Sequence, residues 1–225
     1  EVYSWASTGR QLYEDYDYVA GNTKNYMLNL PGIVPESAVE LTTVFAARSI
    51  GASTYYSVAV NGKARGNATL ASISSDNQYY TRATSASIST SWLGTESENT
   101  VVTVTHTRPS GTSGRLDYIA LNYIRSLTLN APYLTFRSLA SINKETTFVL
   151  SGATASTVVW DVTDPANICR MEGSFAGGTY TFTIPAGKLR EFVAITPEAS
   201  GFDTVETVGN IANQNLHSLG ATDMI

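Results

Sequence analysis

The segment Ala38-Val39-Glu40-Leu41-Thr42-Thr43-Val44-Phe45-Ala46-Ala47-Arg48 decides the fold class, because apolar and polar residues alternate along much of it. Val39, Leu41 and Phe45 fall on one face of an extended chain, as expected of a strand with one buried side. Similar segments recur along the 225 residues, whereas helical periodicity is almost absent. The sequence therefore predicts an all-β protein.

Further segments of this kind occur on both sides of the first, and we expect each to form a strand. In the first part of the chain they are 26–30, 55–60, 79–89, 99–107 and 115–124. Asn61-Gly62 predicts a tight hairpin after 55–60, because both central positions of a type I′ turn need positive φ. In the second part the segments are 133–137, 145–150, 156–163, 179–184 and 189–196.

A boundary between two β domains is expected at Asn130-Ala131-Pro132, because proline cannot donate to a strand ladder and disfavours helix at Ala131. Residues 1–130 are predicted to form a jelly-roll, galactose-binding-like sandwich, since strands with two apolar faces require two packed sheets. Residues 131–207 are predicted to form a small immunoglobulin-like sandwich without the usual cysteine pair. Val158, Trp160 and Val162 share one face of 156–163, so the tryptophan is expected to point into its core.

The composition argues against several classes of partner. The net charge is −5, and the 14 basic residues are scattered singly, without the stripe that binding to nucleic acid requires. No apolar run approaches the roughly 20 residues needed to cross a bilayer, so no membrane span is expected. A single cysteine excludes an internal disulfide, and burial of apolar side chains must hold both domains together.

The last residues predict the start of a further unit. Residues 211–220 have the pattern of a short helix closed by Gly220, and the chain then ends on Met224-Ile225, an apolar pair typical of a buried strand. Residues 208–225 are therefore expected to be a linker helix and the first strand of an α/β domain. On this interpretation the chain is a fragment of a longer protein.

Cys169 is the one candidate nucleophile with a thiol, and His106 or His217 would be its base. The three residues fall in different predicted units, however. The alternative interpretation is a buried thiol and two ordinary histidines, because free cysteine commonly serves as a small apolar residue.

Acidic residues gather at Glu14-Asp15-Tyr16-Asp17, and Asp15 and Asp17 are the candidate ligands of a structural calcium ion. The spacing differs from the known Asp-x-Asp-x-Asp-Gly calcium loop, so a solvated acidic turn is the alternative. No other metal or cofactor is expected.

Aromatic residues suggest a second function, because their rings stack on sugars and a jelly roll offers a concave face. The candidate ligand-binding residues are Trp5, Tyr79, Tyr80 and Trp92. Packing within the sheets is the alternative use of these side chains. A free-standing carbohydrate-binding or adhesion module is therefore the alternative function.

A series of motifs in a shared order resembles the non-catalytic region before the peptidase domain of gingipain-type cysteine peptidases of Bacteroidetes, in particular the sortases of the type IX secretion system. The motifs are Gly9-Arg10-Gln11-Leu12-Tyr13-Glu14-Asp15-Tyr16, Phe45-Ala46-Ala47-Arg48-Ser49, Val60-Asn61-Gly62, Leu116-Asp117-Tyr118-Ile119-Ala120-Leu121-Asn122-Tyr123, Trp160-Asp161-Val162-Thr163-Asp164-Pro165 and Asn213-Gln214-Asn215-Leu216-His217. The resemblance covers nearly the whole chain.

The resemblance implies a caspase-like peptidase domain whose first strand begins at Asp223-Met224-Ile225. The catalytic histidine and cysteine of the family come later, so neither His217 nor Cys169 takes over those roles. The β domains would brace the peptidase domain in cis or present substrate to it. The resemblance also implies a place on the outer face of the outer membrane, with secreted cargo proteins or surface glycans as further partners.

Overall fold

The computed structural model describes residues 3–5, 11–75, 83–94 and 97–210. The chain divides into two compact units, Glu1–Leu127 and Thr128–Ile225. Within the described residues both units consist of antiparallel strands, apart from one short 3-10 helix, η1 (Leu139–Ile142). The all-β prediction is confirmed.

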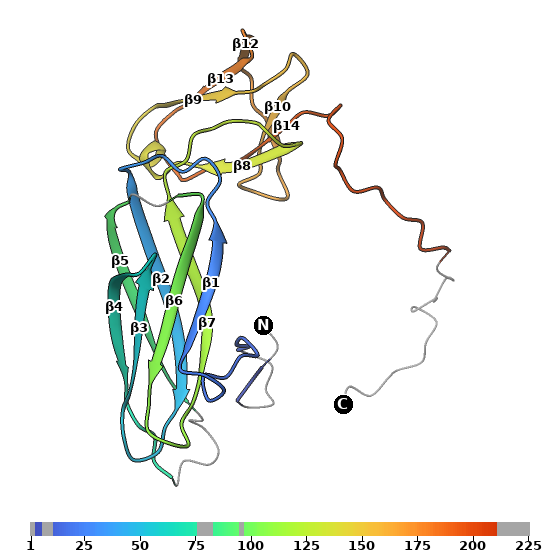
Figure 1. Ribbon diagram of the computed structural model, residues 1–225. Coiled ribbons are helices and arrows are strands. Elements are labelled where there is room, and N and C mark those ends of the chain that lie inside the picture. Colours follow the sequence, from blue (N-terminus) through green and yellow to red (C-terminus); the bar gives the residue numbers. More distant parts are fainter. Residues whose placement is uncertain (1–2, 6–10, 76–82, 95–96, 211–225) are drawn as a thin grey trace. The chain divides into compact units, whose positions relative to one another are not determined.

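The first unit is a sandwich of two antiparallel sheets (Figure 1). One sheet has the strand order β1-β6-β3-β4, and the other has the order β5-β2-β7. The strands are β1 (Thr23–Asn29), β2 (Ala38–Arg48), β3 (Thr54–Val60), β4 (Lys63–Leu70), β5 (Thr84–Leu93), β6 (Asn99–Thr107) and β7 (Ser113–Tyr123). The chain changes sheet at every connection except the β3–β4 hairpin, in the manner of a jelly roll.

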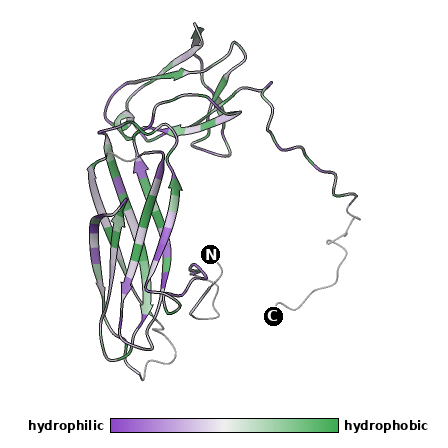
Figure 2. Ribbon diagram, in the orientation of Figure 1, coloured by the Kyte–Doolittle hydropathy of each residue, from purple (hydrophilic) through white to green (hydrophobic). Residues whose placement is uncertain are grey.

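The alternating pattern of β2 produces the core of this unit. Val39, Leu41 and Phe45 are at most 1% exposed, as predicted, and Figure 2 shows apolar and polar positions alternating along the strands. The residues that pack with β2 from the other strands include Tyr56, Val58, Val60, Ile88, Val102, Val104 and Leu116. Each Å² of apolar surface that is buried contributes about 25 cal/mol to stability, so the packing of these side chains is the main source of stability of the sandwich.

The predicted turn at Asn61-Gly62 is confirmed. Asn61 has φ 47° and Gly62 has φ 77°, and Val60 pairs with Lys63 across the hairpin. The partner strand β4 was not predicted, because Lys63–Leu70 has no apolar alternation and forms a strand only through its pairing with β3.

The second unit has two sheets, with the orders β11-β10-β14-β8 and β12-β13-β9. The strands are β8 (Tyr133–Arg137), β9 (Thr146–Ser151), β10 (Val158–Asp161), β11 (Cys169–Arg170), β12 (Ser174–Ala176), β13 (Thr179–Ile184) and β14 (Glu191–Ile195). Its core contains four phenylalanines, one each from β8, β9, β13 and β14, with ring centroids 5.0–6.2 Å apart. They are Phe136, Phe148, Phe182 and Phe192. β8 and β14 belong to one sheet and β9 and β13 to the other, so the packing of the four rings holds the two sheets together.

The predicted inward face of 156–163 is wrong. Val159 is fully buried and Thr157 is 3% exposed, whereas Val158 and Trp160 are only partly buried. Both faces of this segment carry apolar residues, so alternation alone does not decide which one faces the core.

The expected C-terminal helix at 211–220 and the strand onset at Asp223-Met224-Ile225 lie outside the described residues. Residues 201–210 form neither helix nor strand. Within the described ranges, no helix has the length and apolar character needed to cross a membrane.

Candidate functional site

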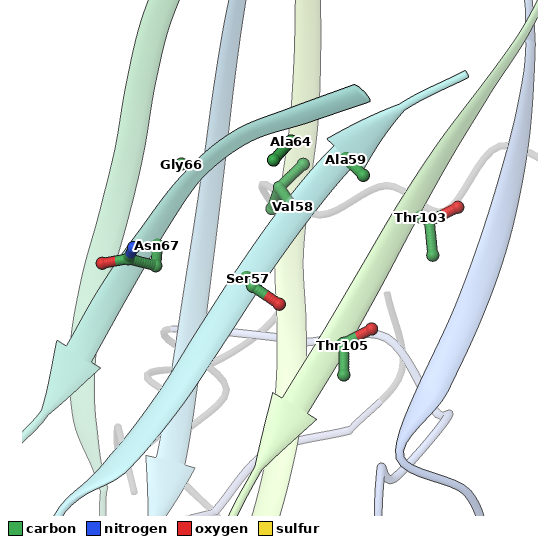
Figure 3. Close-up of a pocket in the computed structure, with 8 residues that line it drawn as sticks. All are labelled: Ser57, Val58, Ala59, Ala64, Gly66, Asn67, Thr103 and Thr105. Atoms are coloured by element: carbon green, nitrogen blue, oxygen red, sulfur yellow. The ribbon is translucent and has the colours of Figure 1, made fainter. Parts of the chain in front are cut away.

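A shallow trough of about 250 Å³ lies on the sheet β1-β6-β3-β4 (Figure 3). Residues of β3, β4 and β6 line it: Ser57, Val58, Ala59, Ala64, Gly66, Asn67, Thr103 and Thr105. The pairing of β3 with β4 shifts register between Val58 and Ala59, and such bulges bend a strand. Small side chains at the outward positions leave this surface hollow.

The trough offers neutral hydrogen-bonding groups. The Thr103 hydroxyl donates to the Asn25 side-chain oxygen at 2.8 Å, and the Thr105 and Thr23 hydroxyls lie 3.0 Å apart. None of the lining residues carries a charge at neutral pH. The lining residues therefore provide no acid and base pair for catalysis.

The Asp17 carboxylate connects the N-terminal segment to β7 by hydrogen bonds. Its carboxylate accepts hydrogen bonds from the Ser113 hydroxyl, from the Val19 amide at 3.0 Å and from the Gly114 amide at 3.2 Å, and Arg115 lies 3.4 Å away. Burial by itself raises the pKa of Asp17, but these hydrogen bonds and the arginine charge outweigh burial and hold the pKa below its usual value.

The other predicted calcium ligand, Asp15, is exposed, and its backbone carbonyl accepts a hydrogen bond from Arg115. The neighbouring Glu14 forms an ion pair with Lys24. Among the described residues, no group of three or more His, Cys, Asp or Glu side chains is placed to hold a metal ion. Calcium binding by Asp15 and Asp17 stays a prediction.

His106, one of the predicted bases, is fully buried in the first unit. Its ring stacks on Tyr56, with centroids 4.1 Å apart, and Tyr56 stacks in turn on Phe45 at 4.3 Å. Neither ring nitrogen has a hydrogen-bond partner. Burial, assisted by the Arg108 charge and opposed by Asp17, lowers the pKa of His106 to about 4. His106 is therefore a neutral core residue, away from any solvent-exposed substrate.

We expect this histidine to make the first unit sensitive to mild acid. The pKa of histidine is 6.5 in the unfolded chain and about 4 for His106 in the folded protein. Between these two pH values the unfolded state binds a proton and the folded state does not, which favours unfolding. The free energy of unfolding should fall by about 2 kcal/mol from pH 7 to pH 5. Urea unfolding of a variant with Trp92 as its single tryptophan reports on this unit.

The matched variant His106→Leu removes the titrating group and should flatten the stability curve over this range. Asp17 does not interfere, because a carboxyl with a lowered pKa loses its contribution only as the pH falls below about 3.8. Equal slopes for the two proteins between pH 7 and pH 5 would contradict the assignment.

Cys169, the candidate nucleophile, lies exposed on β11 in the second unit, where its thiol contacts the Asn167 carbonyl at 3.6 Å. His106 belongs to the core of the other unit, and His217 lies outside the described residues. Because its side chain is fully buried, His106 is not accessible as a base for the exposed thiol of Cys169.

The predicted sugar-binding aromatics are engaged with protein groups where they are described. Trp5 packs edge-on against Tyr3 and Tyr13, with centroids 5.5 and 4.9 Å away, and the Arg65 guanidinium lies 3.8 Å from the Trp92 ring centroid. Tyr79 and Tyr80 lie outside the described residues. Sugar binding by these four residues remains a prediction.

Comparison with known proteins gives a fold neighbour. No protein-family model matches the chain, and no curated protein matches it. Among solved structures, the crystal structure of dimeric latent PorU from Porphyromonas gingivalis matches 87% of this chain with a TM-score of 0.73. The chain has the fold of part of PorU. The sequence identity is 20%, and the match covers 19% of the PorU chain, so the similarity concerns the fold of about a fifth of PorU.

The fold similarity to PorU agrees with the resemblance of the sequence motifs to the type IX sortases. Sequence reasoning did not identify the trough, although a signal for it exists. Ser57, Thr103 and Thr105 occupy positions between buried residues of β3 and β6, and their small polar side chains mark an outward face that no apolar layer covers.

Proposed function

We propose that this chain is a non-catalytic β region of a gingipain-like cysteine peptidase related to the type IX sortases, located at the cell surface. The observation that carries the proposal is the PorU-like fold, which extends over 87% of the chain. The ordered motifs from Gly9 to His217 support it from the sequence side. The alternative, a free-standing carbohydrate-binding module, gains no support from the engaged rings of Trp5 and Trp92.

On this proposal the two sandwiches brace a peptidase domain in cis or present substrate to it. The chemistry of the described residues is compatible with such a role, because His106 is buried and Cys169 lies in the other unit. Val205 and Val208 are 100% and 99% exposed, as expected of a segment that contacts a further domain. Secreted cargo proteins and surface glycans are the other partners of the proposed protein.

A thiol-directed activity probe tests the proposal on the full-length gene product. We expect the probe to label a cysteine beyond residue 225, and the variant Cys169→Ser to keep the peptidase activity of the full-length protein. The 225-residue chain alone should not hydrolyse fluorogenic peptides. A gene without a peptidase domain, or loss of activity in Cys169→Ser, would overturn the proposal.

A further inference from the structure

The two sheets of the first unit leave an opening along one flank. In the described chain β1 pairs only with β6 and β7 pairs only with β2, so each ends its own sheet (Figure 1). A cleft of about 270 Å³ lies there, with Tyr26 and Leu28 of β1 on one wall and Asp117, Tyr118 and Ile119 of β7 on the other. An open strand edge beside an apolar cleft is a site for strand addition.

A bulge in β7 shapes the cleft. Leu116 pairs with Phe45 and Tyr118 pairs with Val44, which leaves Asp117 as an extra residue opposite β2. An extra residue increases the local twist and exchanges the two faces of the strand after it. Asp117 and Tyr118 thus line the cleft at the point where the sheet edge bends.

The chain already uses the two ends of this edge for strand-like hydrogen bonds. On one side, the Glu14 amide donates to the Leu116 carbonyl at 3.0 Å. Beyond the other end of β7, the Val34 amide donates to the Ile124 carbonyl at 2.9 Å. Between them, within the described residues, the backbone of Tyr118–Tyr123 pairs with β2 only. The middle of the edge therefore remains open to another extended chain.

The charges of the cleft are unbalanced. Glu14 and Asp117 both line it, and Glu14 is neutralised by its ion pair with Lys24. Asp117 accepts a hydrogen bond from the neutral Gln11 side-chain amide at 2.9 Å and forms no ion pair with a described residue. A ligand with a basic side chain would complement this carboxylate, while Leu28 and Ile119 offer apolar contact.

We propose that the cleft between β1 and β7 binds an extended peptide, which adds as a strand to the Asp117–Tyr123 edge and directs a lysine or arginine to Asp117. Its backbone forms the missing ladder hydrogen bonds, and an apolar side chain of the peptide packs on Leu28 and Ile119. The proposal stands on the geometry of the first unit and does not depend on the peptidase relationship.

Fluorescence anisotropy with a labelled nine-residue peptide tests this binding on the 225-residue chain. The probe alternates valine and threonine around a central lysine. N-methylation of alternate amides removes several strand hydrogen bonds and should weaken binding at least about tenfold. Replacing the central lysine by glutamate should also weaken binding. No binding of the lysine probe, or equal binding of the N-methylated probe, would overturn the proposal.

Variants and amide hydrogen exchange locate the site. Asp117→Asn should weaken the lysine probe by roughly two- to fivefold, as expected for a solvent-accessible ion pair. Glu40→Gln removes an exposed charge from β2 of the same sheet and should leave binding unchanged. The probe should slow exchange in Asp117–Tyr123. Protection confined to the trough of β3, β4 and β6, or equal effects of the two variants, would contradict the proposed site.

Discussion

Gly114→Ala should destabilise the first unit by about 3 kcal/mol or more, at the upper end of the cost of overpacking a core. A Cβ at this position would lie 2.3 Å from the Tyr56 hydroxyl, 2.4 Å from His106 Cε1 and 2.5 Å from His106 Nδ1. Tyr56 and His106 are both fully buried and stacked on each other, so neither ring has room to withdraw. The Gly114 amide also donates to Asp17, so a backbone shift would weaken the anchor of the N-terminal segment.

Gly111→Ala is the matched control for this prediction. Gly111 has φ 79°, and nothing lies within 4 Å of a Cβ built on it, so alanine there meets only the backbone cost of about 1–2 kcal/mol. Urea unfolding followed through Trp92 compares the two variants. Adding Tyr56→Phe removes the nearest clashing atom and should restore part of the loss in Gly114→Ala. A loss no larger than that of Gly111→Ala would show that the ring stack is loosely packed.

The sequence predicts those strands well whose own alternation decides their burial. The bounds of β2, β6 and β13 agree with the predicted ranges 38–48, 99–107 and 179–184. Strands that do not show such alternation are missed, or their buried face is predicted wrongly. β4 depends on its pairing with β3, β11 and β12 are too short to show a period, and β10 is apolar on both faces.

The candidate site is predictable only in part. His106 shares the parity of Val102 and Val104 in β6, so its burial could have been deduced from the sequence. To predict the trough, one would also have to know of the bulge at Val58. To predict the cleft, one would have to know of the bulge at Asp117 and which strands lie at the edges of the sheets. Those features arise from pairing between distant segments, which local periodicity does not encode.

Phe192→Ala should destabilise the second unit by about 3–5 kcal/mol, because it combines lost apolar burial with a cavity between the sheets. Phe192 is 1% exposed, and its ring centroid lies 5.4 Å from Phe136, 5.3 Å from Phe148 and 5.2 Å from Phe182. It therefore contacts every other member of the phenylalanine cluster. With no disulfide among the described residues, this cluster is the principal link between the two sheets.

Phe175→Ala is the control, because Phe175 belongs to the same unit but is 42% exposed on β12. Its removal deletes a ring of the same size from the surface and should cost less than about 1 kcal/mol. Calorimetry of the whole chain measures both variants, and Phe192→Ala should shift the transition of the second unit while that of the first stays in place. Similar losses in the two variants would mean that the four rings do not form one packed core.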